Sequence, residues 1–541
     1  MKTMKNNLFV FAVATFTLFI ISCTGEEANT KEGKENKSTA GVVTFETAEV
    51  PATRTSIDHT VGGGAIAYWE MGDKIFVKDD DGTYRQSTSS DITGKTKRAK
   101  FQLSGNFGQK QNYSVAYVGT SGQPNYFSIQ DVQTQVEPNN TKHFGEAGDC
   151  GIATAKGSNG NFFFLLEHRA SYLCFLPRTA NTILQNCYLT KVEVISDNDI
   201  VGQYKISDSG ELTRYSSGGT KATVVTKGTG AYSNGFPLTN TTTSPETNAA
   251  YMVIEPGTHK LTIKYYIKDY ASQVEGTVTK EVPERDYKPN TVYDFTANLM
   301  AKDYTQYMHN YYMWDATVGQ DYWNGVSDDD IRAAQIIYPA QTPYPNYPKN
   351  NSDPRWYSEA YSYTPPTFPR ASRSCATAPN MNEMIWYVQY GDPRYDDEIW
   401  TFNKHLYKGG LWLKKRNVIA TEQGTTTAAM NVASPDGLDR RDTFHPHSSG
   451  NWTPFPAPSQ TMPSDAEKAK YFYLPALGES AIGYIISIGS RGAYWTSTPS
   501  HSGGSQYAIR LEFISSSIDI TQYSTNSAAY RYGGCQVWAF E

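Results

Sequence analysis

The sequence contains little charge for its length and no strong excess of either sign. Asp, Glu, Lys and Arg make up 19 % of the 541 residues, below the ~25 % usual for soluble domains. The 48 basic and 54 acidic side chains leave a formal net charge of −6, and the longest basic cluster is Lys414–Arg416. Nucleic-acid-binding domains usually carry a basic excess or patch. The composition therefore argues against nucleic acid as a partner.

Long apolar runs, metal-binding cysteine pairs and common catalytic motifs are also missing. A mean hydropathy of −0.54 leaves no room for several membrane-spanning runs of ~20 residues. No Walker motif, GxSxG or HExxH occurs. The six cysteines are widely spaced and include no CxxC pair, so they predict no disulfide framework. Cys174 lies in an apolar segment and is expected to be a small buried side chain.

The sequence is instead rich in aromatic and turn-forming residues. Aromatic residues reach 13 %, with 39 Tyr, and 43 Gly and 27 Pro accompany them. This composition excludes a disordered chain and favours many short strands joined by turns. At roughly 150 residues per domain, the length predicts three domains.

The first 41 residues are predicted to serve export and anchoring. Lys2 and Lys5 precede a short apolar core, and the segment ends at Ser22–Cys23. This pattern resembles a bacterial lipoprotein signal peptide over residues 1–23, with Cys23 as the lipidated residue. Glu26 and Glu27 resemble the surface-export signal of Bacteroidetes lipoproteins, and residues 24–41 should form a flexible tether. The alternative is an ordinary secretory signal with a chance cysteine.

From about residue 42 to 300 the sequence is a succession of predicted strands. In 260–268, Leu, Ile and Tyr alternate with Lys and Thr, which is typical of a half-solvated sheet strand. Further strands are predicted at 42–50, 161–166, 170–176 and 291–299. We expect two β-sandwich domains, 42–180 and 181–300.

Several segments of this region resemble the fimbrillin family of Bacteroidales. The segments are Ala52–Thr55, Trp69–Ile75, Gln133–Gln135, Phe164–Ser171, Ile254–Thr258 and Thr291–Phe295. The resemblance implies two transthyretin-like β-sandwiches and a subunit that assembles with other fimbrial subunits by donor-strand exchange.

Strand exchange would require the chain to lose its first strand. The resemblance implies proteolytic maturation at Arg54, which would release strand 42–50 and leave Thr55 as the new N-terminus. A sandwich without this strand would expose unpaired N–H and C=O groups that a neighbour's strand could fill. The alternative is that Arg54 is only a polar loop residue.

Residues 301–541 are expected to form a different, α+β domain. A helix is predicted over 328–337 with Ser327 as its N-cap. A second helix is predicted over 381–390, where Asn380 and Glu383 form a capping box. Between them, the Pro- and Tyr-rich segment 338–369 should be an extended loop.

This C-terminal part resembles the Fibrobacter succinogenes major paralogous domain. The matching segments are Cys375–Glu383, Gly409–Lys415, Tyr473–Ala476, Gly492–Thr498 and Tyr532–Val537. The resemblance implies a C-type-lectin-like fold. The usual final Val-Arg-Cys is replaced by Val537–Ala539, so pairing of Cys375 with Cys535 stays open.

Exposed aromatic side chains are the best candidates for ligand binding, because sugars stack on flat rings that also carry a polar group. The candidates in irregular segments are Trp323, Trp356, Trp452 and Tyr530, whereas Trp314, Trp412 and Trp495 are expected in the core. Glu137–Asn139 matches the calcium-binding tripeptide of C-type lectins but lies in the fimbrillin-like part, so we interpret it as a coincidence. Asp328–Asp330 is better explained as carboxylates in the first turn of a helix. His445–His447 has no His, Cys or Glu partner at helical spacing. We predict no catalytic residues, metal or cofactor.

The sequence thus predicts a mainly β surface lipoprotein of the outer membrane, most simply the tip adhesin of a fimbria. A stalk subunit should end in a free donor strand, whereas this sequence continues to residue 541 within a predicted compact domain. Its partners would be other fimbrial subunits, membrane lipid through Cys23, and a glycan or protein ligand. The alternatives are a fimbrial anchor subunit, a monomeric glycan-binding lipoprotein and, third, an enzyme acting on glycans.

Overall fold

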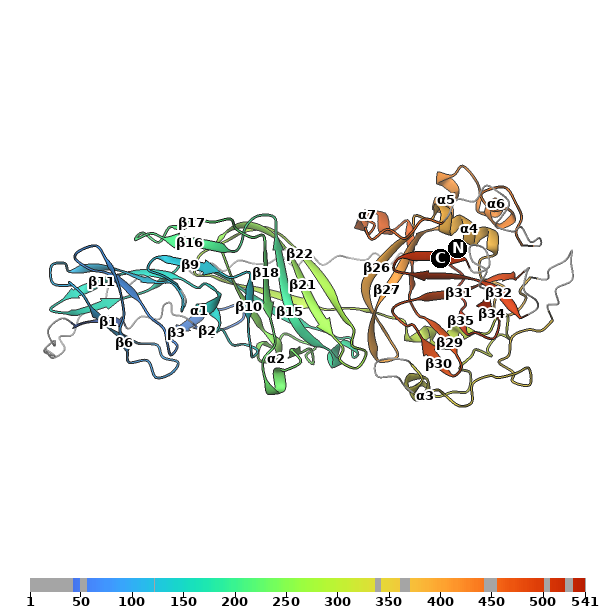
Figure 1. Cartoon of the computed structure of the whole chain (residues 1–541), viewed down its shortest axis with the longest axis horizontal. Coiled ribbons are helices and arrows are strands. Elements are labelled where there is room, and N and C mark those ends of the chain that lie inside the picture. Colours follow the sequence, from blue (N-terminus) through green and yellow to red (C-terminus); the bar gives the residue numbers. More distant parts are fainter. Residues whose placement is uncertain are drawn as a thin grey trace, which may run out of the picture.

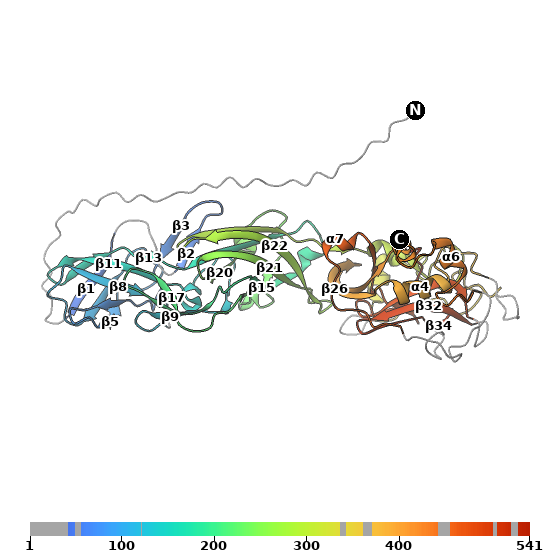
Figure 2. The same ribbon diagram turned by 90° about the horizontal axis from the view of Figure 1, so that it is seen from above.

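A computed structural model describes residues 42–48, 56–120, 122–335, 342–360, 370–441, 455–500, 506–520 and 529–540. The predicted signal peptide 1–23, Cys23, the tether 24–41, Arg54, Thr55, Trp452 and His445–His447 lie outside these residues. The described chain is mainly β and forms three lobes arranged in a row (Figures 1 and 2). No described helix is both long and apolar enough to cross a membrane.

The first lobe is a nine-stranded sheet in the order β5-β4-β8-β11-β12-β1-β7-β6, with β13 paired to β11. Its strands are β1 Val42–Thr47, β4 Phe76–Lys78, β5 Tyr84–Gln86, β6 Ser89–Ser90, β7 Lys100–Ser104, β8 Asn112–Tyr117, β11 Gly151–Ser158, β12 Asn161–Phe164 and β13 Glu167–His168. The core between them is strongly aromatic. Trp69 is fully buried, with Phe101 5.0 Å and Tyr117 5.8 Å away between ring centroids.

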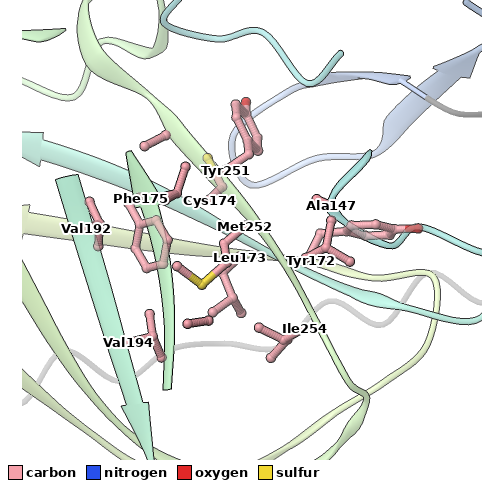
Figure 3. Close-up of a cluster of buried hydrophobic side chains, with 14 of the residues drawn as sticks. Ala147, Tyr172, Leu173, Cys174, Phe175, Val192, Val194, Tyr251, Met252 and Ile254 are labelled. Carbon is pink, nitrogen blue, oxygen red and sulfur yellow. The ribbon is translucent and has the colours of Figure 1, made fainter. Parts of the chain in front are cut away.

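The second lobe stacks several smaller sheets around one large core (Figure 3). Its sheets run β10-β18-β15-β21-β22 with β19 on β15, β20-β14-β23, β17-β16-β9, and the hairpin β2-β3. Its strands are β2 Ser56–His59, β3 Ala65–Tyr68, β9 Tyr126–Ile129, β10 Val132–Thr134, β14 Ser171–Arg178, β15 Tyr188–Ser196, β16 Gly202–Ile206, β17 Leu212–Arg214, β18 Lys221–Val225, β19 Phe236–Pro237, β20 Ala250–Ile254, β21 Gly257–Lys268, β22 Glu275–Tyr287 and β23 Val292–Asn298. Its short helices are α1 Phe144–Ala147, α2 Pro245–Asn248, and the 3-10 turns η1 Leu184–Asn186 and η2 Gly230–Tyr232.

Two strands of the second lobe are buried as their sequence patterns predict. β21 buries Leu261, Ile263, Tyr265 and Ile267, the four apolar residues of its alternating stretch. β14 is buried along nearly its whole length because it lies between β20 and β23 in the interior of the lobe.

The boundary between the first two lobes differs from the expected position near residue 180. β14 lies entirely within the second lobe. β9 and β10, which belong to the expected first sandwich 42–180, also pair with strands of the second lobe. The hairpin β2-β3 also packs there, through Ile57 and Ala67. Strand pairing across long sequence distances leaves no local signal, so alternation alone could not assign these strands to a lobe.

The third lobe combines sheets with the longest helix of the described chain. Its sheets run β24-β26-β27-β28, β25-β35-β31-β32-β33 with β34 on β32, and β29-β30. Its strands are β24 Lys302–Asp303, β25 Tyr311–Tyr312, β26 Arg394–Phe402, β27 His405–Lys414, β28 Tyr471–Pro475, β29 Glu479–Ala481, β30 Tyr484–Ile486, β31 Gly492–Pro499, β32 Tyr507–Ile514, β33 Ser517–Ile520, β34 Ala529–Tyr530 and β35 Cys535–Gln536. Its helices are η3 Thr305–Asn310, α3 Asp328–Ala333, α4 Met381–Tyr390, α5 Arg416–Glu422, α6 Thr427–Val432 and α7 Asp465–Lys468.

Both predicted helices of this lobe are present. α4 spans Met381–Tyr390 with the reciprocal Asn380–Glu383 capping box. α3 starts as predicted, with the Ser327 side chain accepting a hydrogen bond from Asp330 N–H, but ends at Ala333. The three carboxylates 328–330 therefore occupy the first turn of a helix, where the helix dipole favours negative charge.

The second and third lobes meet where the turn after β21 packs on the β26-β27 hairpin. The Asp269 carboxylate accepts hydrogen bonds from Leu406 N–H at 3.1 Å and pairs with His405 at 3.3 Å. Gly276 allows a close approach, because a Cβ atom there would lie 2.0 Å from Cγ2 of Ile399.

Candidate functional site

The first predicted feature, strand 42–50, corresponds over Val42–Thr47 to β1, which occupies the interior of its sheet. It runs parallel to β12 and antiparallel to β7. Thr44 N–H donates to Gly160 C=O at 2.9 Å, and Thr47 N–H donates to Ala99 C=O at 3.1 Å. Both neighbours therefore depend on β1 to satisfy their backbone groups on that side.

One side chain of β1 fills the centre of the first lobe. Phe45 is fully buried, and its ring lies 5.0 Å from Phe162, 5.4 Å from Phe107 and 6.1 Å from Tyr113 between centroids. The adjacent Glu46 points outward and pairs with Lys100 at 3.4 Å. The strand thus combines two hydrogen-bonded edges with one large apolar anchor.

The next hairpin, β2-β3, is held by the second lobe and not by β1. Ile57 N–H donates to Thr141 Oγ1 at 2.7 Å, and that hydroxyl donates to Ile57 C=O at 3.0 Å. Ser56 is buried and donates to Glu70 at 2.7 Å. The predicted maturation position, Arg54–Thr55, falls between β1 and this hairpin in sequence, outside the described residues. The two strands on either side of it therefore belong to different lobes.

The second predicted feature, an exposed aromatic surface, is present at the other end of the molecule. Five rings form what we call the aromatic ladder: Tyr507, Tyr530, Tyr532, Trp356 and Tyr357. Consecutive centroid distances are 4.8 Å, 4.8 Å, 6.4 Å and 4.9 Å. Tyr530 and Tyr532 are 43 % and 42 % exposed. Figure 1 places β34, which carries Tyr530, in the lobe farthest from β1.

Strand pairing and a buried arginine position the rings of the aromatic ladder. Tyr507 on β32 and Tyr530 on β34 are direct cross-strand partners, and the neighbouring Tyr507 side chain raises the pKa of Tyr530. Beside Trp356, the nearly buried Arg355 pairs with Asp353 at 2.7 Å. It also donates to the backbone oxygen of Asn346 at 2.7 Å. The Asp353 carboxylate holds the pKa of Arg355 above its usual value, so the arginine stays charged and fixes this loop.

The four predicted ligand residues have different outcomes. Trp356 and Tyr530 lie together in the aromatic ladder. Trp323 is wrong as a surface ligand residue, because it is fully buried and its Nε1 donates to Ser480 at 2.8 Å. Trp452 lies outside the described residues. Tyr532, Tyr507 and Tyr357 were not predicted as ligand residues. Tyr532 lies in the turn after β34, so no strand periodicity marks it in the sequence.

The tryptophans expected in the core follow the prediction in two of three cases. Trp314 and Trp495 are fully buried. Trp412 is only partly buried, and its Nε1 donates to Asp396 at 3.0 Å.

The five described cysteines are buried thiols. Cys174 is buried as predicted. Cys375 and Cys535 lie in one small cluster with Trp314 and Trp495 but are not joined. Burial raises the pKa of Cys535 to about 12, so its thiol is protonated at neutral pH.

Comparisons with known proteins found only distant structural likeness. No family model and no curated protein matches the chain. A candidate cell adhesion protein of Bacteroides ovatus is 13 % identical with a TM-score of 0.28, over 48 % of this chain and 91 % of that one. Another from Bacteroides fragilis is 10 % identical with a TM-score of 0.29, over 47 % and 92 %. A fimbrial protein of Bacteroides ovatus is 10 % identical with a TM-score of 0.21, over 86 % and 93 %. Matches at these values do not place the chain in a family.

Proposed function

We propose that this chain is a subunit of an adhesive surface filament, assembled by strand exchange at its first lobe and binding its ligand at its third. It is exported as a lipoprotein through Cys23 to the outer membrane. Cleavage after Arg54 frees β1, and a strand of a neighbouring subunit takes its place. The chain acts by binding and not as an enzyme.

The position of β1 carries this proposal. A strand at the edge of a sheet could leave with one row of hydrogen bonds, but β1 lies between two partners. Its removal would leave β7 and β12 with unpaired backbone groups and would empty the site of Phe45. Such a groove is a template for an incoming strand, and the held hairpin β2-β3 would keep the rest of the chain folded.

The aromatic ladder supports a ligand-binding role for the third lobe. Rings that are partly exposed and fixed in orientation can stack on sugar faces at low entropic cost, and their hydroxyl groups can accept or donate hydrogen bonds. The ligand we propose is a glycan, with a protein surface as the alternative. The assignment of this lobe to a C-type-lectin-like fold stays a prediction.

The tip of the filament is the position we favour. Among the described strands, β35 lies between β25 and β31 and is not free to donate. The strand-exchange lobe and the aromatic ladder lie at opposite ends of the row of lobes (Figure 1), so a tip subunit would point its ladder outward. An anchor subunit or a monomeric glycan-binding lipoprotein are the alternatives.

Strand exchange can be tested on the purified protein. Residues 49–54 are replaced by the recognition sequence of a specific protease, the chain is cut, and a labelled peptide with the sequence of residues 42–48 is added in excess. We expect the label to enter the protein, and a peptide with Ala in place of Phe45 to fail. Absence of exchange after complete cleavage, under mild denaturant as well as in buffer, would refute the proposal.

Location and ligand need separate tests. Immunogold labelling should mark filament ends; label at filament bases would indicate the anchor, and an even coat without filaments would exclude both filament roles. A glycan array probed with the full chain should show binding that is lost when Trp356 and Tyr532 are both changed to Ala. No binding on the array would direct the search to protein ligands.

A further inference from the structure

A group of three metal-ligand side chains lies where the β2-β3 hairpin meets the second lobe. The ligand atoms of His59, Cys174 and Asp294 all lie within 4.8 Å of one another, the one such group of three found among the described residues. His59 ends β2, whereas Cys174 and Asp294 are direct partners on the parallel strands β14 and β23. The three residues are therefore brought together by the fold from positions over 100 residues apart.

The surroundings of this group fit a bound cation. The Gly62 N–H donates to the second carboxylate oxygen of Asp294 at 2.8 Å, which fixes the carboxylate as outer-shell hydrogen bonds do in metal sites. The His59 side chain is 1 % exposed, and its Nε2 atom faces Oδ1 of Asp294. The Tyr251 hydroxyl donates to Asn139 Oδ1 at 2.8 Å. In Figure 3 the Cys174 sulfur and the Tyr251 ring lie next to each other at the edge of the buried cluster.

The chemistry of the three ligands indicates which ion would bind. One thiolate, one imidazole and one carboxylate suit zinc, whereas calcium and magnesium require oxygen ligands. With zinc bonds of about 2.0–2.3 Å, ligand atoms in a tetrahedral site lie roughly 3.3–3.7 Å apart. His59 Nε2 and Asp294 Oδ1 are 2.7 Å apart, so side-chain movements on the order of 1 Å would seat the ion.

We propose that His59, Cys174 and Asp294 bind a zinc ion that fastens the β2-β3 hairpin to the second lobe. Zinc would replace the thiol proton of Cys174, which is released to solvent, and a water molecule would complete the fourth position. The site holds together the part of the chain that follows the predicted cut after Arg54. It does not depend on that cut, because the three ligands lie on one side of it.

Cobalt binding provides a direct test, because a thiolate bound to cobalt gives a charge-transfer band in the near ultraviolet. The chain from residue 24 onward is freed of metal and titrated with Co²⁺. We expect the band to saturate at one equivalent and to disappear when zinc is added. A titration of the unaltered protein that gives no thiolate band would overturn the proposal.

Substitutions of the three residues test whether each of them binds the metal ion. C174S should lose the band, whereas C187S, which alters another buried cysteine of the same lobe, should keep it. H59Q and D294N should weaken zinc affinity at least about tenfold. Circular dichroism reports whether each variant is folded. If C174S does not fold, H59Q and D294N decide, and unchanged zinc affinity in both would contradict the site.

Discussion

Phe45 should determine how firmly β1 stays in the first lobe. The side chain is fully buried and contacts three other rings. Changing such a Phe to Ala costs about 3–5 kcal/mol, from lost burial and from the cavity left behind. The lower value corresponds to a roughly 100-fold change in an equilibrium constant. F45A should therefore weaken retention of a cleaved β1 by at least about two orders of magnitude.

The assay uses the protein with a protease site in place of residues 49–54 and a fluorophore at its N-terminus. After cleavage, release of the labelled strand is followed by fluorescence anisotropy. The matched control is F163A on the neighbouring β12, because Phe163 is 52 % exposed and its loss should change stability by less than about 0.5 kcal/mol. Equal release from F45A and the unaltered protein, or equal effects of F45A and F163A, would refute the reasoning.

Three further predictions concern the other lobes and the joint between them. For the aromatic ladder, W356A or Y532A should weaken glycan binding roughly three- to tenfold in a titration, while W412A leaves it unchanged. For acid stability, burial lowers the pKa of His143 from 6.5 to about 4. As the pH falls from about 6.5 to 4, the unfolded chain binds a proton at His143 that the folded chain does not, so the free energy of unfolding decreases; because His143 is only partly buried, the decrease should be on the order of 1–2 kcal/mol. Denaturant titrations at several pH values should show this decrease in the unaltered protein and not in H143Q. For the joint, G276A should force Ile399 away at a cost of about 1–3 kcal/mol and change the small-angle scattering profile, whereas G94A, with open space around it, should not.

Local sequence patterns predicted helix caps and the buried face of a strand, but they did not predict which strands pair across long sequence distances. The alternation in β21 and the Asn380–Glu383 capping box are set by neighbouring residues, so both were correctly predicted. The assignment of β14 to the first sandwich was wrong. β14 pairs with β20 and β23, which lie far along the chain and leave no signal in the sequence around β14.

The same limit applies to the candidate sites. Trp323 lies in an irregular segment, which suggested exposure, yet an irregular segment can pass through a core when its polar atoms find partners such as Ser480. Trp356 and Tyr530 lie 174 positions apart in the sequence, and only the fold shows that Tyr532 joins them into one surface. The group of His59, Cys174 and Asp294 has no sequence signature, because its members come from three strands.

The central claim is that β1 is removed and replaced when the protein assembles. Filaments are sheared from the cell surface and purified, and the N-terminus of this chain within them is determined by mass spectrometry. The account predicts a chain that begins at Thr55, without residues 42–48. A chain in assembled filaments that still begins at a lipidated Cys23 would contradict it.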